Sequence, residues 1–173
     1  MKLGLSVTIG LFIWMCLEIA VLLFSNKELI LSSFDRTEGE DIKPESREYN
    51  LRALTLGGLT FAGIALLIDA YSADIQRAID IIIILIYSFG LFLCSYKIEV
   101  LTNYKRLFWI MQEKFLNFGF LGLVASLAVF FYTERLTIVL AEFIVFSVII
   151  VIIHLQEFKL DYKSYSERSV SQK

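Results

Sequence analysis

Histidine, proline and cysteine are scarce in this chain. Its 173 residues contain one His, one Pro and two Cys. A single histidine excludes the common His-rich metal and redox centres, and neither Cys16 nor Cys94 has a second Cys or His at metal-site spacing. P-loop, GxSxG, HExxH and CxxC sequences are all absent. We therefore expect no enzyme, cofactor or metal site, and expect both cysteines to be small buried hydrophobic residues.

Charged residues are also few. They make up 20% of the chain, whereas soluble domains have about 25%. The net charge is −2, and residues 25–52 carry seven acidic against five basic side chains, so no polybasic arm is present. We expect no direct binding of nucleic acid, and expect Lys105 and Arg106 to contact lipid headgroups.

Apolar residues, in contrast, make up 57% of the chain, which excludes both a disordered protein and an ordinary soluble enzyme domain. Five stretches are long and apolar enough to cross a bilayer as helices: 3–24, 53–71, 79–98, 115–132 and 137–155. The first could be a secretory signal, but its apolar core is long and no A-x-A cleavage site follows it, so we expect a retained span. The sequence predicts an all-α integral membrane protein, a single membrane domain over 1–173.

The lengths of the connections predict the topology. Residues 72–78 and 133–136 are short turns, so one N-terminal helix is followed by two antiparallel hairpins. Segments 25–52, 99–114 and 156–173 are longer, and within them residues 35–41 suggest a loop. A helix is expected to begin at Pro44 and to run into the second span.

Basic residues predict the orientation. Counted with Lys97, the three longer segments hold 13 of the 16 Lys and Arg, which places them in the cytoplasm by the positive-inside rule. We expect a multi-pass protein of the cytoplasmic (inner) membrane, with its N-terminus outside and its C-terminus inside.

Four carboxylates lie within or at the ends of the spans: Glu18, Asp69, Asp80 and Glu142. Since every Lys and Arg lies outside the apolar cores, we expect no basic partner for them inside a span. Those near the outer face are either solvated helix ends or, in an oligomer, a cation-attracting ring at a pore mouth. Glu18 is a buried hydrogen-bonding group, a pore-lining carboxylate or a protonated acid. His154, at the cytoplasmic interface, is either a pH sensor or an ordinary interfacial residue.

Two cytoplasmic segments carry apolar residues at spacings of three and four, which is typical of a helix face. The first pattern predicts an amphipathic helix over 99–115, lying on the inner interface or extending the third span, and it comprises Leu101, Tyr104, Phe108, Met111 and Phe115. The second predicts a short heptad seam in the tail, comprising Leu155, Phe158, Tyr162 and Tyr165. This seam would join copies of the chain or dock a partner, unless the tail is a frayed helix end.

Small residues favour close approach of helices in a membrane. In the second span Gly58 and Ala62 lie four residues apart, and Gly10 is on the first span. The fourth span carries Gly119 and Gly122. We expect these faces to be helix contacts, either within one chain or between copies.

The stretch 52–68, RALTLGGLTFAGIALLI, followed by two tight hairpins, resembles small membrane subunits of bacterial anti-phage systems. The KwaA family of the Kiwa system is the first choice, and the HalA channel effectors of Hailong have a similar layout. The resemblance covers about 100 residues (53–155). It implies a homotetramer, a cytoplasmic partner and a role in sensing or punishing infection, and it assigns no functional residue.

Two functions fit these observations. The first is a non-conducting membrane anchor or sensor, itself a homo-oligomer, that holds a cytoplasmic effector protein. Its partner or oligomer contacts would be Leu101, Tyr104 and Phe108 of the 99–115 helix and the seam residues of the tail. The alternative is an oligomeric ion channel that dissipates membrane gradients, since five short helices are too few to enclose a wide pore alone. The spans carry few polar residues to line a water-filled path, which favours the anchor.

Overall fold

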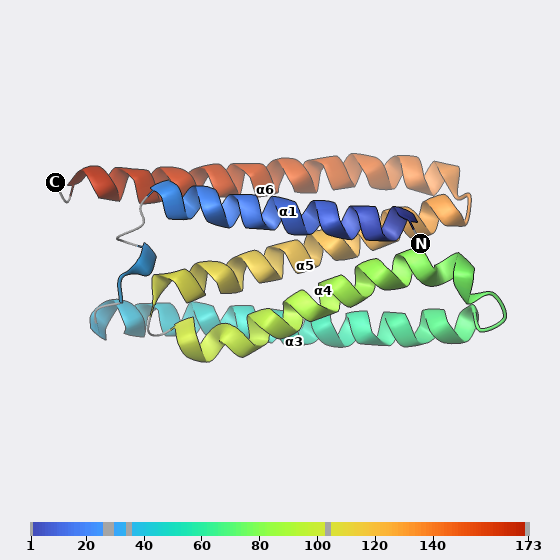
Figure 1. Cartoon of the computed structure of the whole chain (residues 1–173), viewed down its shortest axis with the longest axis horizontal. Helices are drawn as coiled ribbons and strands as arrows, with labels where there is room; N and C mark the ends of the chain where they lie inside the picture. Colours follow the sequence, from blue (N-terminus) through green and yellow to red (C-terminus); the bar gives the residue numbers. More distant parts are fainter. Residues whose placement is uncertain (1, 26–29, 34–35, 103–104, 172–173) are drawn as a thin grey trace.

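Over the residues that the structure describes, the chain forms a bundle of five long helices, seen in a computed structural model (Figure 1). The structure describes residues 2–25, 30–33, 36–102 and 105–171, with side chains for 3–25, 30–33, 43–102 and 105–163. The helices are α1 (Lys2–Ser25), α3 (Arg36–Ala70), α4 (Ile75–Thr102), α5 (Arg106–Thr133) and α6 (Thr137–Ser171). Each is long and apolar enough to cross a membrane, which confirms the predicted fold class.

The helices lie side by side along the long axis of the molecule (Figure 1). We call the end with the turns at 71–74 and 134–136 the hairpin end; the N-terminus lies there too. The opposite end, where α6 finishes, is the tail end. Helix α4 packs on α1, α3 and α5, whereas α6 packs on α1 and α5. This is the predicted arrangement of one helix followed by two hairpins.

The outer helices expose most of their apolar surface. Half of the span residues of α4 are buried, against 6% for α6 and 17% for α1. In water this would be unstable, but in a bilayer the lipid chains cover such faces. For the same reason the expectation of buried cysteines is wrong: Cys16 and Cys94 are both exposed on the bundle surface.

Close packing is concentrated between α4 and α5. A Cβ added at Gly119 would lie 2.6 Å from the Phe92 ring, and one at Gly122 would lie 2.2 Å from the Ser88 hydroxyl. The expected contact face of the fourth span is thus confirmed. Around Gly58 and Gly10, in contrast, an added Cβ meets nothing within 4 Å, so neither glycine makes a close contact within this chain.

Two expected boundaries are wrong. Helix α3 begins at Arg36, not at Pro44, so the residues from 36 to 41 are helical rather than a loop. A proline inside a helix removes one backbone hydrogen bond and crowds the carbonyl four residues earlier, yet α3 continues through Pro44. Beyond Pro44, Ser46 is buried and bonds to Gln112 of α5, which fixes this part of α3 against the bundle.

The stretch 99–115 is not one helix, because α4 ends at Thr102 and α5 begins at Arg106. Ser33 pairs with Lys105 in an isolated β-bridge at this connection. Leu101 is exposed at the end of α4, Phe108 is half-buried at the start of α5, and Tyr104 lies outside the described residues. The apolar residues keep their spacing of three and four across the turn between α4 and α5. The stretch also contains no Gly or Pro that would have indicated the end of a helix.

The crossing of α1 and α4 yields a test. A Cβ at Gly4 would lie 2.4 Å from the backbone oxygen of Asp80. We expect Gly4→Ala to lower the free energy of unfolding by about 1–3 kcal/mol, the usual cost of overpacking. In the matched variant Gly10→Ala the methyl group meets open space, so removal of a helical glycine should raise stability by about 0.5–1 kcal/mol.

Thermal unfolding in detergent, followed by circular dichroism, compares the two variants. Equal midpoints would show that α1 does not approach α4 this closely.

Candidate functional site

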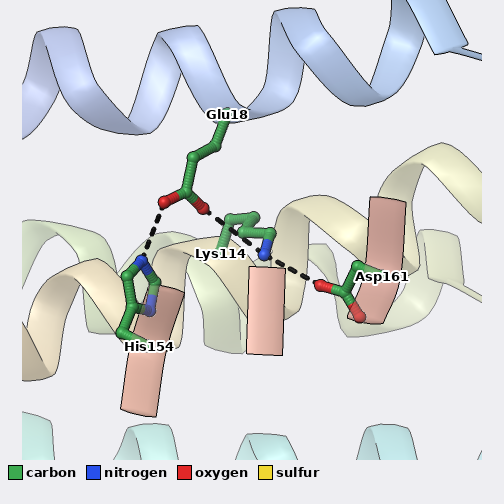
Figure 2. A network of polar contacts seen from close by, with 4 residues as sticks. All are labelled: Glu18, Lys114, His154 and Asp161. Carbon is green, nitrogen blue, oxygen red and sulfur yellow. Dashed lines mark hydrogen bonds and ion pairs between the residues drawn. The ribbon is translucent and has the colours of Figure 1, made fainter. Parts of the chain in front are cut away.

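A network of buried charged groups joins α1, α5 and α6 near the tail end (Figure 2). Glu18 of α1 is 3% exposed, and its two carboxylate oxygens face different partners. His154 Nε2 lies 2.9 Å from Oε1, and Lys114 Nζ lies 3.5 Å from Oε2. Lys114 also donates to Asp161 Oδ2 at 3.0 Å. We call Glu18, Lys114, His154 and Asp161 the ionic network.

The spacing on α6 explains why its residues meet α1 and α5. His154, Phe158 and Asp161 follow one another at four and three residues, so they share one helix face. Phe158 packs with Leu22 and other apolar residues of α1 and α5, and Lys114 Nζ lies 5.3 Å from the centre of its ring. A seam of helical spacing therefore exists in this tail, on the face that the bundle covers.

That seam includes only one of the residues that the heptad pattern selected. Phe158 points into the bundle, whereas Leu155 is 47% and Tyr162 is 43% exposed. The side chain of Tyr165 lies outside those that the structure describes. Any partner or second copy would therefore meet Leu155 and Tyr162 rather than Phe158.

The expectation that no basic residue neutralises the carboxylates is wrong for Glu18. Lys114 was assigned to a cytoplasmic segment because the apolar stretch begins at residue 115. In the structure α5 begins at Arg106, so Lys114 is the ninth residue of a helix and its side chain is 1% exposed. Hydropathy locates the first residue of an apolar stretch, here residue 115. The helix itself begins nine residues earlier, at Arg106.

Acidic groups outnumber the cation at this site. Glu18 and Asp161 both pair with Lys114, and Glu113 interacts with Lys114, Asp161 and Glu157. Removing one partner of a buried ion pair is costly, so the Lys114 ammonium is the group that these carboxylates require.

Aromatic rings fix His154 in place. The rings of Trp14 and Phe118 contact the imidazole edge to face, with centroids 5.4 and 5.2 Å away. His154 also lines a cavity of about 270 Å³ between α5 and α6, which has Asn117 and Glu157 in its wall.

A second, uncharged network fixes the opposite side of α5. Ser46 of α3 donates to Gln112 Oε1 at 2.9 Å and shares a 2.8 Å hydrogen bond with Thr102 of α4. Gln112 Nε2 donates to the backbone oxygen of Ser46, and Ser95 donates to that of Gln112. Isolated Ser, Thr and Gln residues form no pattern in the sequence, so this cluster could not be predicted from it.

The hairpin-end carboxylates do not converge within one chain. Asp69 and Glu142 are exposed on α3 and α6. Asp80 is half-buried and accepts a hydrogen bond from the Gly4 backbone N–H at 3.0 Å, as a buried cap would. A ring of acids around a pore would therefore need several copies of the chain. Among the described residues, no group of three or more His, Cys, Asp or Glu is placed to hold a metal.

Comparison with known protein families, curated proteins and solved structures finds no match to this chain. The resemblance to the KwaA family therefore rests on the layout of the spans.

The network predicts that substitution of Lys114 has a large effect on the free energy of unfolding. We expect Lys114→Met to lower the free energy of unfolding by about 3–5 kcal/mol, because it leaves buried carboxylates without their cation. Adding Glu18→Gln should recover part of the loss, with a coupling energy of about 0.5–3 kcal/mol. Unfolding of the full chain in detergent measures both.

Arg52→Met is the matched control, since Arg52 pairs with Glu48 on the surface of α3 with both side chains more than half exposed. This variant should unfold like the unmodified chain. If Lys114→Met is as mild as Arg52→Met, the ionic network does not hold the helices together.

Proposed function

We propose that this chain is a non-enzymatic, multi-pass anchor and sensor of the bacterial inner membrane that holds a cytoplasmic effector protein. The observation that carries the proposal is the length of α6. Its 35 residues span about 52 Å at 1.5 Å per residue. The hydrocarbon core of a bilayer is only about 30 Å thick, so roughly 20 Å of continuous helix would project from it.

The ionic network would couple this projecting helix to the membrane. His154 and Asp161 are bonded to Glu18 of α1 and Lys114 of α5, near the place where α6 would leave the bilayer. Any rotation or shift of α6 must break these buried contacts. A stimulus that moves α1 relative to α5 would therefore alter the position of the tail.

The tail also has a surface for a partner. Leu155, Leu160 and Tyr162 are 47%, 67% and 43% exposed in the tail-end half of α6. Apolar side chains on one projecting helix suit a partner with an apolar groove. The resemblance to anti-phage membrane subunits makes an effector of bacterial defence the expected partner.

A homo-oligomeric ion channel is the second candidate, and the exposed acids favour it. Asp69 and Glu142 lie on the surface of apolar helices, where lipid is a poor environment for a carboxylate. Contact between copies would cover these groups or turn them toward a water-filled axis.

The tail is tested by purifying the tagged protein from its native host in mild detergent and weighing it by native mass spectrometry. We expect a stoichiometric cytoplasmic protein, lost from the variant Leu155→Ser/Tyr162→Ser because the apolar contact is removed. Leu136→Ser changes an equally exposed leucine at the hairpin end and should retain the partner. A homo-oligomer with nothing attached would contradict the anchor.

Bilayer recording separates the two candidates. We expect no conductance from the reconstituted chain or from Glu142→Gln. Conductance that changes in the variant would establish the channel instead, because a neutral amide no longer attracts cations.

A further inference from the structure

An apolar groove runs between α3, α4 and α5 in the half of the bundle nearer the hairpin end. Its volume is about 380 Å³, within the range of about 300–1,000 Å³ that small-molecule sites occupy. Leu59, Gly63 and Leu67 line it from α3, Leu85 from α4, and Leu127 and Phe130 from α5. The groove uses no residue of the ionic network.

The groove offers almost nothing to a polar ligand. Only two side chains in its wall are polar, Thr60 and Ser126. The Thr60 hydroxyl donates to the backbone oxygen of Leu56 at 2.6 Å, and that of Ser126 donates to Leu123 at 2.7 Å. Both donors are thus used within their own helices. A polar ligand would leave its acceptors without partners, so the occupant is apolar.

The position and size of the groove further limit which ligands can occupy it. It lies within the apolar spans of three helices, where lipid chains and other helices are the available neighbours. A flexible alkyl chain is narrow and wholly apolar, so it can fill a hollow of this size.

A polar cluster continues the groove toward the hairpin end. Tyr71 and Glu134 each follow a groove residue, Leu67 and Phe130, by four positions, so they lie one turn further on the same faces. Glu134 accepts a hydrogen bond from Tyr71 at 2.5 Å and pairs with Arg77 at 2.9 Å. The Arg77 side chain is 49% exposed, so its remaining N–H groups reach water or a headgroup.

We propose that this groove binds one alkyl chain of a membrane phospholipid whose headgroup lies at the cluster of Tyr71, Arg77 and Glu134. The chain fills the apolar hollow, and the phosphate accepts hydrogen bonds from the exposed guanidinium of Arg77. The site goes beyond the anchor and sensor role, and it holds equally for a channel.

Two glycines of α3 provide a matched pair of variants. An added Cβ meets nothing within 4 Å at either Gly63 or Gly58, but only Gly63 lines the groove. Gly63→Leu fills the hollow, whereas Gly58→Leu adds the same side chain to an exposed position. Both have room for the new side chain, so both are expected to fold, which circular dichroism and gel filtration check.

The probe is a phosphatidylethanolamine with a diazirine in one acyl chain, added at increasing amounts to the full-length chain in micelles and in phosphatidylethanolamine–phosphatidylglycerol vesicles. After illumination, mass spectrometry maps the labelled peptides. We expect saturable labelling of groove peptides, several-fold above that of the outer face of α6. Labelling of the groove should fall several-fold in Gly63→Leu and stay unchanged in Gly58→Leu.

Two further variants test the headgroup. Arg77→Gln removes the guanidinium and should raise the concentration for half-saturation several-fold. Glu134→Gln breaks the same ion pair but leaves the Arg77 guanidinium available, so the lipid concentration for half-saturation should not rise. Equal losses in both variants would overturn the headgroup placement.

Three results would overturn the site itself: labelling that rises without saturation in groove and α6 alike, an unchanged pattern in Gly63→Leu, or cross-links that join two copies across the groove. Saturation of groove labelling, and its loss when unlabelled phospholipid competes, are measured on the unmodified chain. These two results therefore test the lipid site even if Gly63→Leu does not fold.

Discussion

The Lys114 ammonium is the group on which the tail end of the bundle depends. A buried cation must be met by anions, and Lys114 is met from two sides, by Glu18 of α1 and Asp161 of α6. Helix α6 packs on α1 and α5 and exposes most of its apolar surface, so its position along the bundle is not set by a tight core. The charges set it instead, because a shift of one turn would separate each of them from its partner.

Helix α5 lies between the other helices because its buried polar residues bond to α3 on one side and to α1 and α6 on the other. Gln112 and Lys114 are two positions apart, so they point to nearly opposite sides of the helix. Gln112 bonds to α3, while Lys114 bonds to α1 and α6. Nearer the middle of the helix, Gly119 and Gly122 bring its backbone close to α4. Polar bonds at the tail end and small residues further along hold one helix against four others.

The sequence predicts the five spans, their order and the pairing into hairpins, because hydropathy and loop length depend on local composition. It did not predict that Lys114 lies inside a helix, since charged residues at the border of an apolar stretch look the same whether they face water or a buried carboxylate. Glu18 was singled out as a costly group, yet its partners lie 96 and 136 residues away in the chain. Such pairs follow from the packing of helices and leave no local pattern.

The ionic network draws its members from α1, α5 and α6, which are far apart in the sequence. Glu18 enters the membrane early in synthesis, whereas His154 and Asp161 emerge only after four spans have been made. Until then α1 carries a carboxylate without its full set of partners, which makes the insertion of this helix in the bilayer less favourable. A chain that stops before α6 would hold Glu18 with Lys114 alone, so the carboxylate would lack one of its two partners inside the bundle.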